Sequence, residues 1–440
     1  MQVEQILGVL LAAGLPEHEV QGWLDAEPPQ AEASEPSRAL DHHWQRAGMF
    51  IQRGEALYDQ LPPRCRRTEA ERLAAESISR ILRDCRIHFL RDRAGEVYAA
   101  LTGNLSELVR VDDLVARAAI RFPGLTPSAA RVRLEGQRAL RDKEAFEIDQ
   151  GFFLWQILSH PQSGAHLVQS MLRPLPEALL LQDQFRANHR VALDLADVTR
   201  EGKVGIVEHR NPDFLNAEDD ATNRSLELAV DLVLLDSEIE VCVLRGAPVQ
   251  HAKYRGRRVF NSGLNLTRLY EGGLPFLFYM TRDLGLVSKI YRGHAPETYR
   301  PLEGETGHEK PWIAAVETFA IGGGCQLLLV MDRVLAERDA YFSLPARKEG
   351  IIPGAANLRL PRVVGDRMAR RGIFFDQPFP ADSDEGRLLC DELVPIGGMD
   401  QAITRVCASL ASSGLVSAAG NRKAIRVGQE PLTVFQAYMA

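Results

Sequence analysis

The sequence of 440 residues has few cysteines, no histidine spacing typical of metal sites and no long apolar run. Its six cysteines are far apart and form no Cys-x-x-Cys pair, which favours unpaired thiols in a reducing compartment over a disulfide framework. The eleven histidines include no HxxxH or HExxH pattern. No stretch reaches the ~18 apolar residues of a membrane span, and Glu4 stands where a signal peptide would carry Lys or Arg. We therefore expect a cytoplasmic protein with no metal site and no membrane association.

An excess of positive charge is also absent. The formal net charge is −7, so the composition gives no support to nucleic-acid binding. Arginines do gather at 64–67 and 131–141, but acidic residues interleave with both groups, as on solvated helix faces. The 45% of apolar and 25% of charged residues are typical of a globular protein.

The pattern of apolar and polar residues differs between the two halves of the chain. Residues 27–37, "EPPQAEASEPS", are typical of a surface linker. From about residue 38 to about 185 apolar residues recur at helical spacing, as in "RTEAERLAAESISRILRDCRIHFL" with Leu73, Ile78 and Phe89. We expect an all-α N-terminal domain over residues 1–189 and a second domain over 190–440.

From about residue 190 onward the sequence predicts a mixture of strands and helices. "RVALDLADVTREGKVGIVEH" alternates apolar and polar residues around a Glu-Gly-Lys turn, which predicts a β-hairpin. "SLELAVDLVLLDSE" is typical of a helix, and "IEVCVLRGA" and "PWIAAVETFAI" are each typical of a buried strand. Strands separated by helices predict an α/β unit with a largely parallel sheet.

Three consecutive glycines stand out in "FAIGGGCQLLLVMDRVLA", residues 319–336. They follow an apolar strand and precede a stretch with helical spacing. One interpretation is an ordinary tight turn between strand and helix. The other is an oxyanion hole, because glycine lets another molecule approach main-chain N–H groups that a helix start leaves unpaired.

Four stretches in fixed order support the second interpretation: "HRNPDFLNAEDD" (209–220), "RRVFNSGLNL" (257–266), "KPWIAAVETFAIGGGCQL" (310–327) and "AYFSLPARKEGIIPGAANLRLPRVVG" (340–365). Together they resemble the crotonase (enoyl-CoA hydratase/isomerase) superfamily over about residues 190–400. The resemblance implies the crotonase, ClpP-like spiral of ββα units behind the helical N-terminal domain. It also implies subunits assembled as a homotrimer or homohexamer.

The resemblance implies site residues by position. The N–H groups of Leu264 and Gly323 would hold the thioester oxygen of a coenzyme A substrate. Hydratases of the superfamily carry glutamates where this chain has Gln326 and Ala346. Gln326 cannot act as a carboxylate base but can form a hydrogen bond near the thioester, so simple hydration is not expected.

The stretches around these departures are most similar to the (3,5-dihydroxyphenyl)acetyl-CoA 1,2-dioxygenase branch of the superfamily. That resemblance implies oxidative cleavage of an arylacetyl-CoA by O2, with no metal or organic cofactor, to 3,5-dihydroxyphenylglyoxylate for the dihydroxyphenylglycine of glycopeptide antibiotics. We expect Glu218 to contact a ring hydroxyl or to transfer a proton, and Arg282 to hold a substrate hydroxyl. Each also has an ordinary alternative, a surface acid for Glu218 and a helix-surface ion pair for Arg282.

Other functions stay open at this point. An oxyanion hole serves any enolate or tetrahedral oxyanion, so a crotonase-fold acyl-CoA hydrolase or isomerase is an alternative. The missing glutamates also permit a non-catalytic acyl-CoA-binding protein. His251 and Lys253 are candidates for contact with coenzyme A phosphates, although a solvated loop explains them better.

Overall fold

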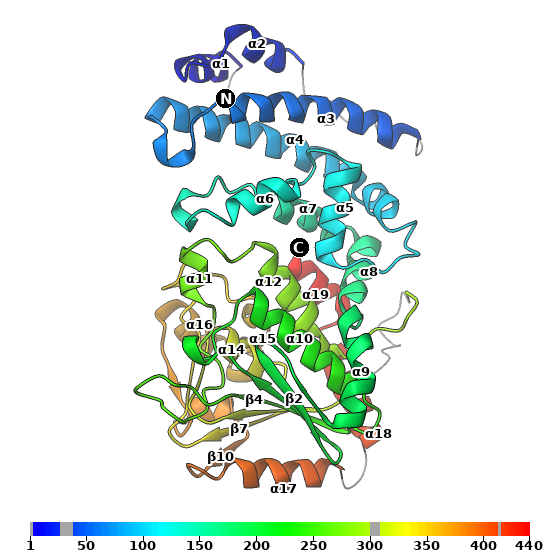
Figure 1. Ribbon diagram of the computed structural model, residues 1–440, viewed down its shortest axis with the longest axis vertical. Helices are drawn as coiled ribbons and strands as arrows, with labels where there is room; N and C mark the ends of the chain where they lie inside the picture. The colour runs from blue at the N-terminus through cyan, green and yellow to red at the C-terminus, as the bar shows by residue number, and fades with distance from the viewer. Residues whose placement is uncertain (1–2, 27–37, 300–308, 412–414) are drawn as a thin grey trace. The chain divides into compact units, whose positions relative to one another are not determined.

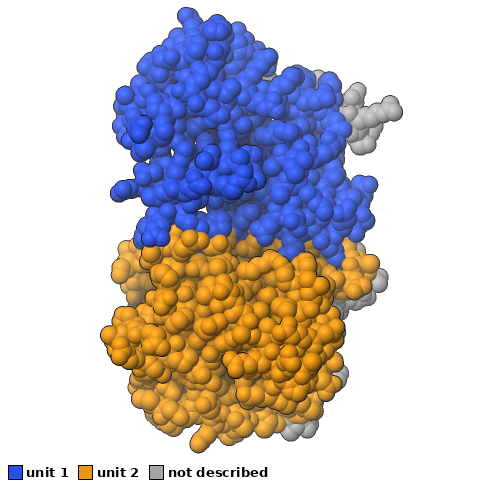
Figure 2. All heavy atoms as spheres, in the orientation of Figure 1, with its two compact units in different colours: residues 1–167, 269–277, 439–440 blue, residues 168–268, 278–438 orange. Residues whose placement is uncertain are grey.

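The computed structural model describes residues 3–26, 38–299, 309–411 and 415–440 (Figure 1). The linker expected at 27–37 lies outside the described residues. The chain divides into two compact units, drawn in two colours in Figure 2: Met1–Leu167 with Leu269–Leu277 and Met439–Ala440, and Val168–Arg268 with Phe278–Tyr438. The domain boundary expected between residues 189 and 190 stays a prediction.

In the described part of the first unit all regular elements are helices, as expected for an all-α domain. They are α1 (Val3–Ala12), α2 (Glu17–Leu24), α3 (Arg38–Asp59), η1 (Arg64–Arg66), α4 (Glu69–Leu101), α5 (Val111–Arg121), α6 (Ala129–Glu135), η2 (Leu140–Asp142), α7 (Ile148–Ser159) and most of α8 (Pro161–Met171).

The long helix α4 shows how this unit is specified. It begins with a capping box, in which the N–H of Thr68 donates to Glu71 and the N–H of Glu71 donates back to the Thr68 hydroxyl. Ile78 and Phe89 are buried at helical spacing, whereas Leu73, which has the same spacing, is 46% exposed. Periodicity therefore located the helix but not every core residue.

The second unit contains two sheets. Its strands are β1 (Arg190–Ala192), β2 (Ala196–Glu201), β3 (Val204–His209), β4 (Val241–Gly246), β5 (Trp312–Val316), β6 (Phe319–Ile321), β7 (Arg333–Glu337), β8 (Tyr341–Ser343), β9 (Phe379–Pro380) and β10 (Glu392–Val394). The larger sheet has the order β1-β2-β3-β4-β5-β7-β10, and the smaller has the order β6-β8-β9.

The remaining helical elements lie wholly or partly in the second unit. They are α9 (Pro176–Asn188), η3 (Pro212–Phe214), α10 (Asp220–Leu235), α11 (Leu266–Tyr270), α12 (Leu277–Thr281), the π-helical turn η4 (Arg282–Val287), α13 (Ser288–Arg292), α14 (Gly323–Leu328), α15 (Ala356–Val364), α16 (Asp366–Phe375), η5 (Gly386–Leu388), α17 (Met399–Ala411), α18 (Leu415–Gln429) and α19 (Leu432–Met439).

The expected hairpin and the largely parallel sheet are confirmed. β2 and β3 pair antiparallel across a turn at Gly202, whose φ of 60° favours glycine. β3, β4, β5, β7 and β10 pair parallel in succession. Helix α10 provides the crossover from β3 to β4, as βαβ connections do.

Two expected elements differ from the structure. The single strand expected over 311–321 is two strands in different sheets, β5 and β6, separated at Glu317 and Thr318. The helical stretch expected after the glycines ends at Leu328, and residues 333–337 form the buried strand β7. A strand buried on both faces has a continuous apolar pattern, which cannot be distinguished from a buried helix by periodicity.

Alternate residues of the central strands face two cores. Val243 and Ile313 pack on one face with residues of α17, while Leu244 and Ala314 lie in the larger core on the other face, which includes residues of α10. Figure 1 shows α17 and α10 on opposite sides of the strands. The sheet is thus a rigid layer that carries the connecting loops at its edges.

The end of the chain packs back on the second unit through a buried carboxylate. Glu430 is fully buried and accepts hydrogen bonds from Arg359 and Arg292, with Arg362 3.2 Å away. Burial opposes its ionisation, but the hydrogen bonds and charges of these arginines keep the pKa of Glu430 below its ordinary value. The cluster therefore links α13, which directly follows η4, to α15.

Candidate active site

Gly322 connects β6 to α14, and Gly323 and Gly324 are the first two residues of α14; each glycine has a different structural reason. Gly322 has φ of 53°, a conformation that side chains disfavour. A Cβ on Gly323 would lie 2.1 Å from the Glu218 Oε2, and one on Gly324 would lie 2.7 Å from the Asn261 Cβ. The stretch therefore requires glycine because two other segments approach its backbone closely.

One of those segments is the turn at 261–265. The Glu218 N–H donates to the Gly263 carbonyl, and the Asn265 N–H donates to the Glu218 carbonyl, each at 2.7 Å. Leu264 lies between these bonds, opposite Glu218. The Ile321 N–H donates to the Asn261 carbonyl at 2.9 Å, which fixes the same turn against β6.

Leu264 and Gly323 meet at one cavity of about 140 Å³. Neither of their N–H groups has a hydrogen-bond acceptor among the residues that the structure describes. The remaining lining is mostly apolar or glycine and comprises Ser262, Gly263, Leu266, Ile321, Gly322, Gln326, Leu344, Pro345, Ala346, Glu349, Ile351 and Pro353. Two free main-chain donors on an apolar cavity are suited to an oxygen that gains negative charge.

Arg282 lies behind the cavity wall in η4 and is 4% exposed. Its Nε donates to the Glu218 Oε2 at 2.6 Å and its Nη2 donates to the Glu218 Oε1 at 3.0 Å. Nη2 also donates to the Gly323 carbonyl, and Nη1 donates to Asp283 and to the Gln326 Oε1. All five N–H donors of the guanidinium are therefore used.

These bonds orient Gln326. Because a guanidinium has no acceptor, the Gln326 oxygen faces Arg282 at 2.8 Å and its NH2 group is left as a donor. That NH2 group has no hydrogen-bond partner in the described part of the chain, and Gln326 lines the cavity. A third donor is thus available beside the N–H groups of Leu264 and Gly323.

Both carboxylate oxygens of Glu218 likewise accept hydrogen bonds. It is 2% exposed, and its Oε1 accepts from the Asn261 Nδ2 at 2.9 Å in addition to Arg282. The structure therefore brings all five expected site residues together, but only Leu264, Gly323 and Gln326 line the cavity. Glu218 and Arg282 support them from behind.

Two asparagines of this framework were not among the expected site residues. Asn261 Oδ1 accepts from the Gly263 N–H at 2.7 Å, and the "NSG" sequence is a turn signal of that type. Asn216, at φ 54°, donates to the carbonyls of Ala247 and Val259. Its partners are distant in sequence, so no local pattern indicated this role.

His209 ends β3 next to this framework and is 2% exposed. Its Nδ1 lies 3.5 Å from the Asn261 Nδ2, and its Nε2 has no partner within the described ranges. Burial lowers the pKa of His209 to about 4, although Glu218 and Asp219 oppose the shift. The imidazole is therefore neutral at pH 7.

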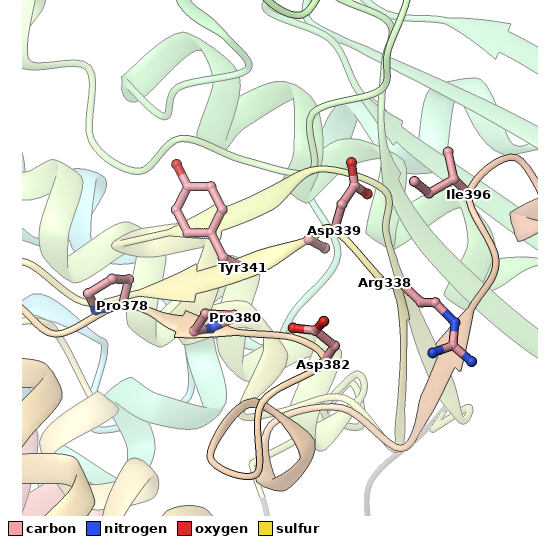
Figure 3. A pocket seen from close by; sticks show the side chains of 8 residues that line it. Arg338, Asp339, Tyr341, Pro378, Pro380, Asp382 and Ile396 are labelled. Atoms are coloured by element: carbon pink, nitrogen blue, oxygen red, sulfur yellow. The ribbon is translucent and has the colours of Figure 1, made fainter.

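Several other features lie outside the cavity lining. His251 and Lys253 belong to an exposed segment, where the Lys253 Nζ lies 5.0 Å from the centre of the Tyr254 ring. A second hollow has a volume of about 590 Å³. Figure 3 shows its lining, which includes Asp339 before β8, Tyr341 at the start of β8, and Pro380 and Asp382. Asp339 is paired with Arg257 at 2.6 Å. The smaller cavity is lined by Leu264 and Gly323, the two residues whose N–H groups are free, so we take it as the site.

The described residues contain no group of three or more His, Cys, Asp or Glu side chains placed to hold a metal ion. Among their helices, none combines the length and the apolar character needed to cross a membrane.

Comparison with known proteins gives one match over 92% of the chain and several over its second half. Residues 199–434 match the enoyl-CoA hydratase/isomerase family. The chain is 43% identical over 406 residues to the (3,5-dihydroxyphenyl)acetyl-CoA 1,2-dioxygenase of Amycolatopsis orientalis, covering 92% of each protein. It is 28% identical to the short-chain-enoyl-CoA hydratase of Clostridium acetobutylicum, over 52% of this chain and 80% of that one. The crystal structure of an enoyl-CoA hydratase from Mycobacterium avium subsp. paratuberculosis K-10 is 24% identical, with a TM-score of 0.45, over 56% of this chain and 87% of that one.

Replacing Arg282 by Met is expected to destabilise the second unit by about 3–5 kcal/mol, because the buried Glu218 carboxylate loses its partner. The double variant Arg282→Met/Glu218→Gln should lose less than the sum of the two single changes. Urea unfolding followed by hydrogen exchange in β4 measures these free energies. The exposed pair Arg268 and Asp220, 3.6 Å apart, is the matched control, with an expected coupling of about 0–1 kcal/mol. Additive single changes at 282 and 218 would contradict the assigned pairing.

We expect His209 to make the second unit less stable as the pH falls from about 6.5 to about 4. Its pKa is about 4 when folded and 6.5 when unfolded, so in this window only the unfolded chain takes up the proton. The stability that neutral His209 contributes to the folded state is fully present above pH 6.5 and is lost as the pH falls toward 4. At about 1.4 kcal/mol per pH unit, this loss in the free energy of unfolding amounts to roughly 3 kcal/mol. Unfolding of His209→Gln should show a correspondingly shallower pH dependence, with His251→Gln as control. Equal slopes for the wild type and His209→Gln would refute this.

Proposed function

The chain belongs to the enoyl-CoA hydratase/isomerase (crotonase) family, and from this premise we propose that it is an arylacetyl-CoA 1,2-dioxygenase acting on (3,5-dihydroxyphenyl)acetyl-CoA and O2. The observation that carries the proposal is the 43% identity to the Amycolatopsis dioxygenase over 92% of both proteins. The hydratase matches cover only about half of this chain. The similarity to the dioxygenase thus includes the helical N-terminal region as well as the crotonase fold.

The cavity supplies the electrostatic part of the reaction. We propose that the N–H groups of Leu264 and Gly323 donate to the thioester oxygen as the adjacent carbon loses a proton and charge moves onto that oxygen. One such donor contributes about 2.7–4 kcal/mol in the transition state, and the apolar lining strengthens it by excluding water. The NH2 group of Gln326 is a third donor at the same cavity.

The same residues argue against hydration. Both positions at which the hydratases carry glutamate line this cavity, and they are Gln326 and Ala346. Neither side chain can deliver a proton or activate water as a carboxylate does. A framework that stabilises an enolate is retained while the pair of acids for adding water is missing.

Glu218 and Arg282 have a positioning role in this proposal. Glu218 fixes the guanidinium, and the guanidinium fixes the Gln326 oxygen and the Gly323 carbonyl. Contact between Arg282 and a ring hydroxyl, the role expected from the resemblance, requires that hydroxyl to replace Asp283 or Gln326 on Nη1. That contact, and proton transfer by Glu218, stay predictions.

The size of the cavity suits an aromatic ring. A cavity of about 150 Å³ with apolar walls holds benzene, and the volume here is about 140 Å³. Leu266, Ile321, Leu344 and Ile351 provide apolar surface for a ring. The coenzyme A portion then lies outside the cavity.

The reaction balances without another reagent. Loss of an α-proton gives a carbanion shared between ring and thioester, and it adds O2 to form a peroxide. The peroxide attacks the thioester carbonyl and expels coenzyme A, and cleavage of the O–O bond with loss of the second α-proton gives the arylglyoxylate. The substrate's two α-hydrogens end as protons on the thiol and the acid.

We propose that no metal or organic cofactor takes part in the reaction and that both atoms of O2 enter the acid. We also propose that the enzyme acts in the cytoplasm as a trimer or hexamer.

Oxygen consumption tests the proposal. The chelator-treated protein is supplied with (3,5-dihydroxyphenyl)acetyl-CoA under ¹⁸O2, and oxygen uptake, free thiol and the mass of the acid are measured. We expect one O2 per thiol released and two heavy atoms in the arylglyoxylate. Thiol release without uptake would instead indicate a hydrolase, a shifted double bond in an enoyl-CoA probe would indicate an isomerase, and binding without any turnover would indicate an acyl-CoA-binding protein.

Replacing Gly323 by Ala is expected to lower kcat by about 100- to 1,000-fold, the cost of losing one main-chain donor. Its Cβ would lie 2.1 Å from the Glu218 Oε2 and 3.0 Å from the Arg282 Nη2, so the amide and the ion pair must shift. Gly428→Ala is the matched control, because no atom lies within 4 Å of a Cβ at that exposed position of α18. Steady-state oxygen uptake measures both variants, and an unchanged kcat in Gly323→Ala would contradict the assigned donor.

A further inference from the structure

The proposed reaction needs a base for the α-carbon, and the cavity lining includes one carboxylate. Of the lining side chains in the described part of the chain, only Glu349 carries a carboxylate, and none of the others is a histidine, lysine, arginine, cysteine or tyrosine. It is half-buried, and it faces the same cavity as the free N–H groups of Leu264 and Gly323. A carboxylate and an oxyanion site on one small cavity are the two parts that enolate formation requires.

The chain turns to bring Glu349 to the cavity. After Pro345 the backbone forms a compact loop in which the Ile351 N–H donates to the Ala346 carbonyl at 2.9 Å and the Gly350 N–H donates to the Arg347 carbonyl at 3.1 Å. Ala346 and Ile351, at the two ends of the loop, both line the cavity. The carboxylate is thus three residues beyond Ala346, the position at which a methyl group has replaced the acid of the hydratases.

The other acids near the site are already engaged. Both oxygens of Glu218 accept from Arg282, and one also accepts from Asn261. Asp283 accepts from the Arg282 Nη1 at 3.0 Å. Neither acid lines the cavity, and neither can accept a proton without weakening a buried ion pair.

Glu349, in contrast, is not part of a buried ion pair. Its carboxylate forms no hydrogen bond or ion pair with any residue in the described ranges. Its neighbour Arg347 is paired with Asp376 at 2.7 Å, and Lys348 is exposed. Neither neighbour lines the cavity. The lone pairs of Glu349 are therefore available to a substrate hydrogen.

We propose that Glu349 is the general base that removes the first α-proton of the arylacetyl thioester. The inference rests on the proposed function. In this step the α C–H bond breaks, the proton goes to a carboxylate oxygen of Glu349, and the electron pair becomes the enolate held by Leu264, Gly323 and Gln326. The enolate is then oxidised by O2, and the proton leaves Glu349 for the sulfur of the departing coenzyme A. One carboxylate suffices here, whereas the addition of water to a double bond uses two.

The test isolates proton transfer from oxygen chemistry. Without O2, the full-length protein is mixed in D2O with (3,5-dihydroxyphenyl)acetyl-CoA, and deuterium entry at the α-carbon is followed by mass spectrometry. Glu349→Gln should reduce exchange by about 100- to 10,000-fold, the usual contribution of a general base, and oxygen uptake in parallel. Its dissociation constant for the substrate, measured anaerobically, should stay within about threefold of the wild-type value. Lys348→Gln, in the same turn, is the matched control and should exchange at the wild-type rate.

Two further measurements keep the test independent of folding. Added formate should restore exchange to Glu349→Ala, because it can replace a missing carboxylate but not a missing structural contact. Glu349→Asp should fall between the wild type and Glu349→Gln, with a larger isotope effect from α-deuterated substrate.

The outcomes separate the two proposals. If the wild type consumes O2 and exchanges the α-hydrogen but Glu349→Gln exchanges equally fast, Glu349 is not the base and the dioxygenase proposal stands. If Glu349→Gln loses substrate binding together with exchange, and formate restores nothing, Glu349 positions the substrate and the inference is overturned. If the wild type neither exchanges nor consumes O2, the proposed function itself fails.

Discussion

The arrangement of the site depends on one buried ion pair between Arg282 and Glu218. All five guanidinium donors are used, and their acceptors belong to segments 41 to 64 residues away as well as to the adjacent Asp283. Because the guanidinium group is planar and rigid, the groups that accept its hydrogen bonds are held at fixed positions relative to one another. The glycine turn, the Gln326 side chain and the segment at Glu218 are consequently fixed relative to one another.

This pair also explains the glycines. Close approach of the Glu218 carboxylate to the backbone at Gly323 leaves no room for a Cβ, and Asn261 occupies the equivalent space at Gly324. A buried carboxylate is costly unless charge and hydrogen bonds compensate it, and three donor atoms compensate this one. The N–H of Gly323 is free because Gly323 is the first residue of α14, and the first N–H groups of a helix have no acceptor within it. The N–H of Leu264 is free because the bonds to the Glu218 segment are made by Gly263 and Asn265 on either side of it.

The sequence predicted the parts of this arrangement that have a local cause. The hairpin at 202 follows from periodicity and turn residues. Periodicity also predicted a helix over 225–238, which in the structure is α10 and runs from Asp220 to Leu235. The crotonase fold, and the choice of Leu264, Gly323 and Gln326 as site residues, were implied by the family resemblance that four ordered motifs carry. The division of 311–321 into two strands was not predicted, because both strands are buried and apolar. Nor was the network around Arg282, whose side chain could equally have paired on a helix surface. The geometry of that network depends on contacts between residues that are distant in sequence. The proposed role of Glu349 depends on such contacts too, because in the sequence Glu349 is one of several acids beside basic residues.

A change in the number of acids can change the reaction while the oxyanion site stays the same. Hydration requires one group to activate water and another to deliver a proton, whereas enolate formation requires only a base and donors for the oxygen. At this cavity Gln326 adds a donor where the hydratases have an acid, and Ala346 adds apolar surface. Both changes stabilise or shelter an enolate and remove the means to place water beside it. An arylacetyl enolate is a strong electron donor, and a site that lacks the groups for adding water leaves O2 as the reactant for it.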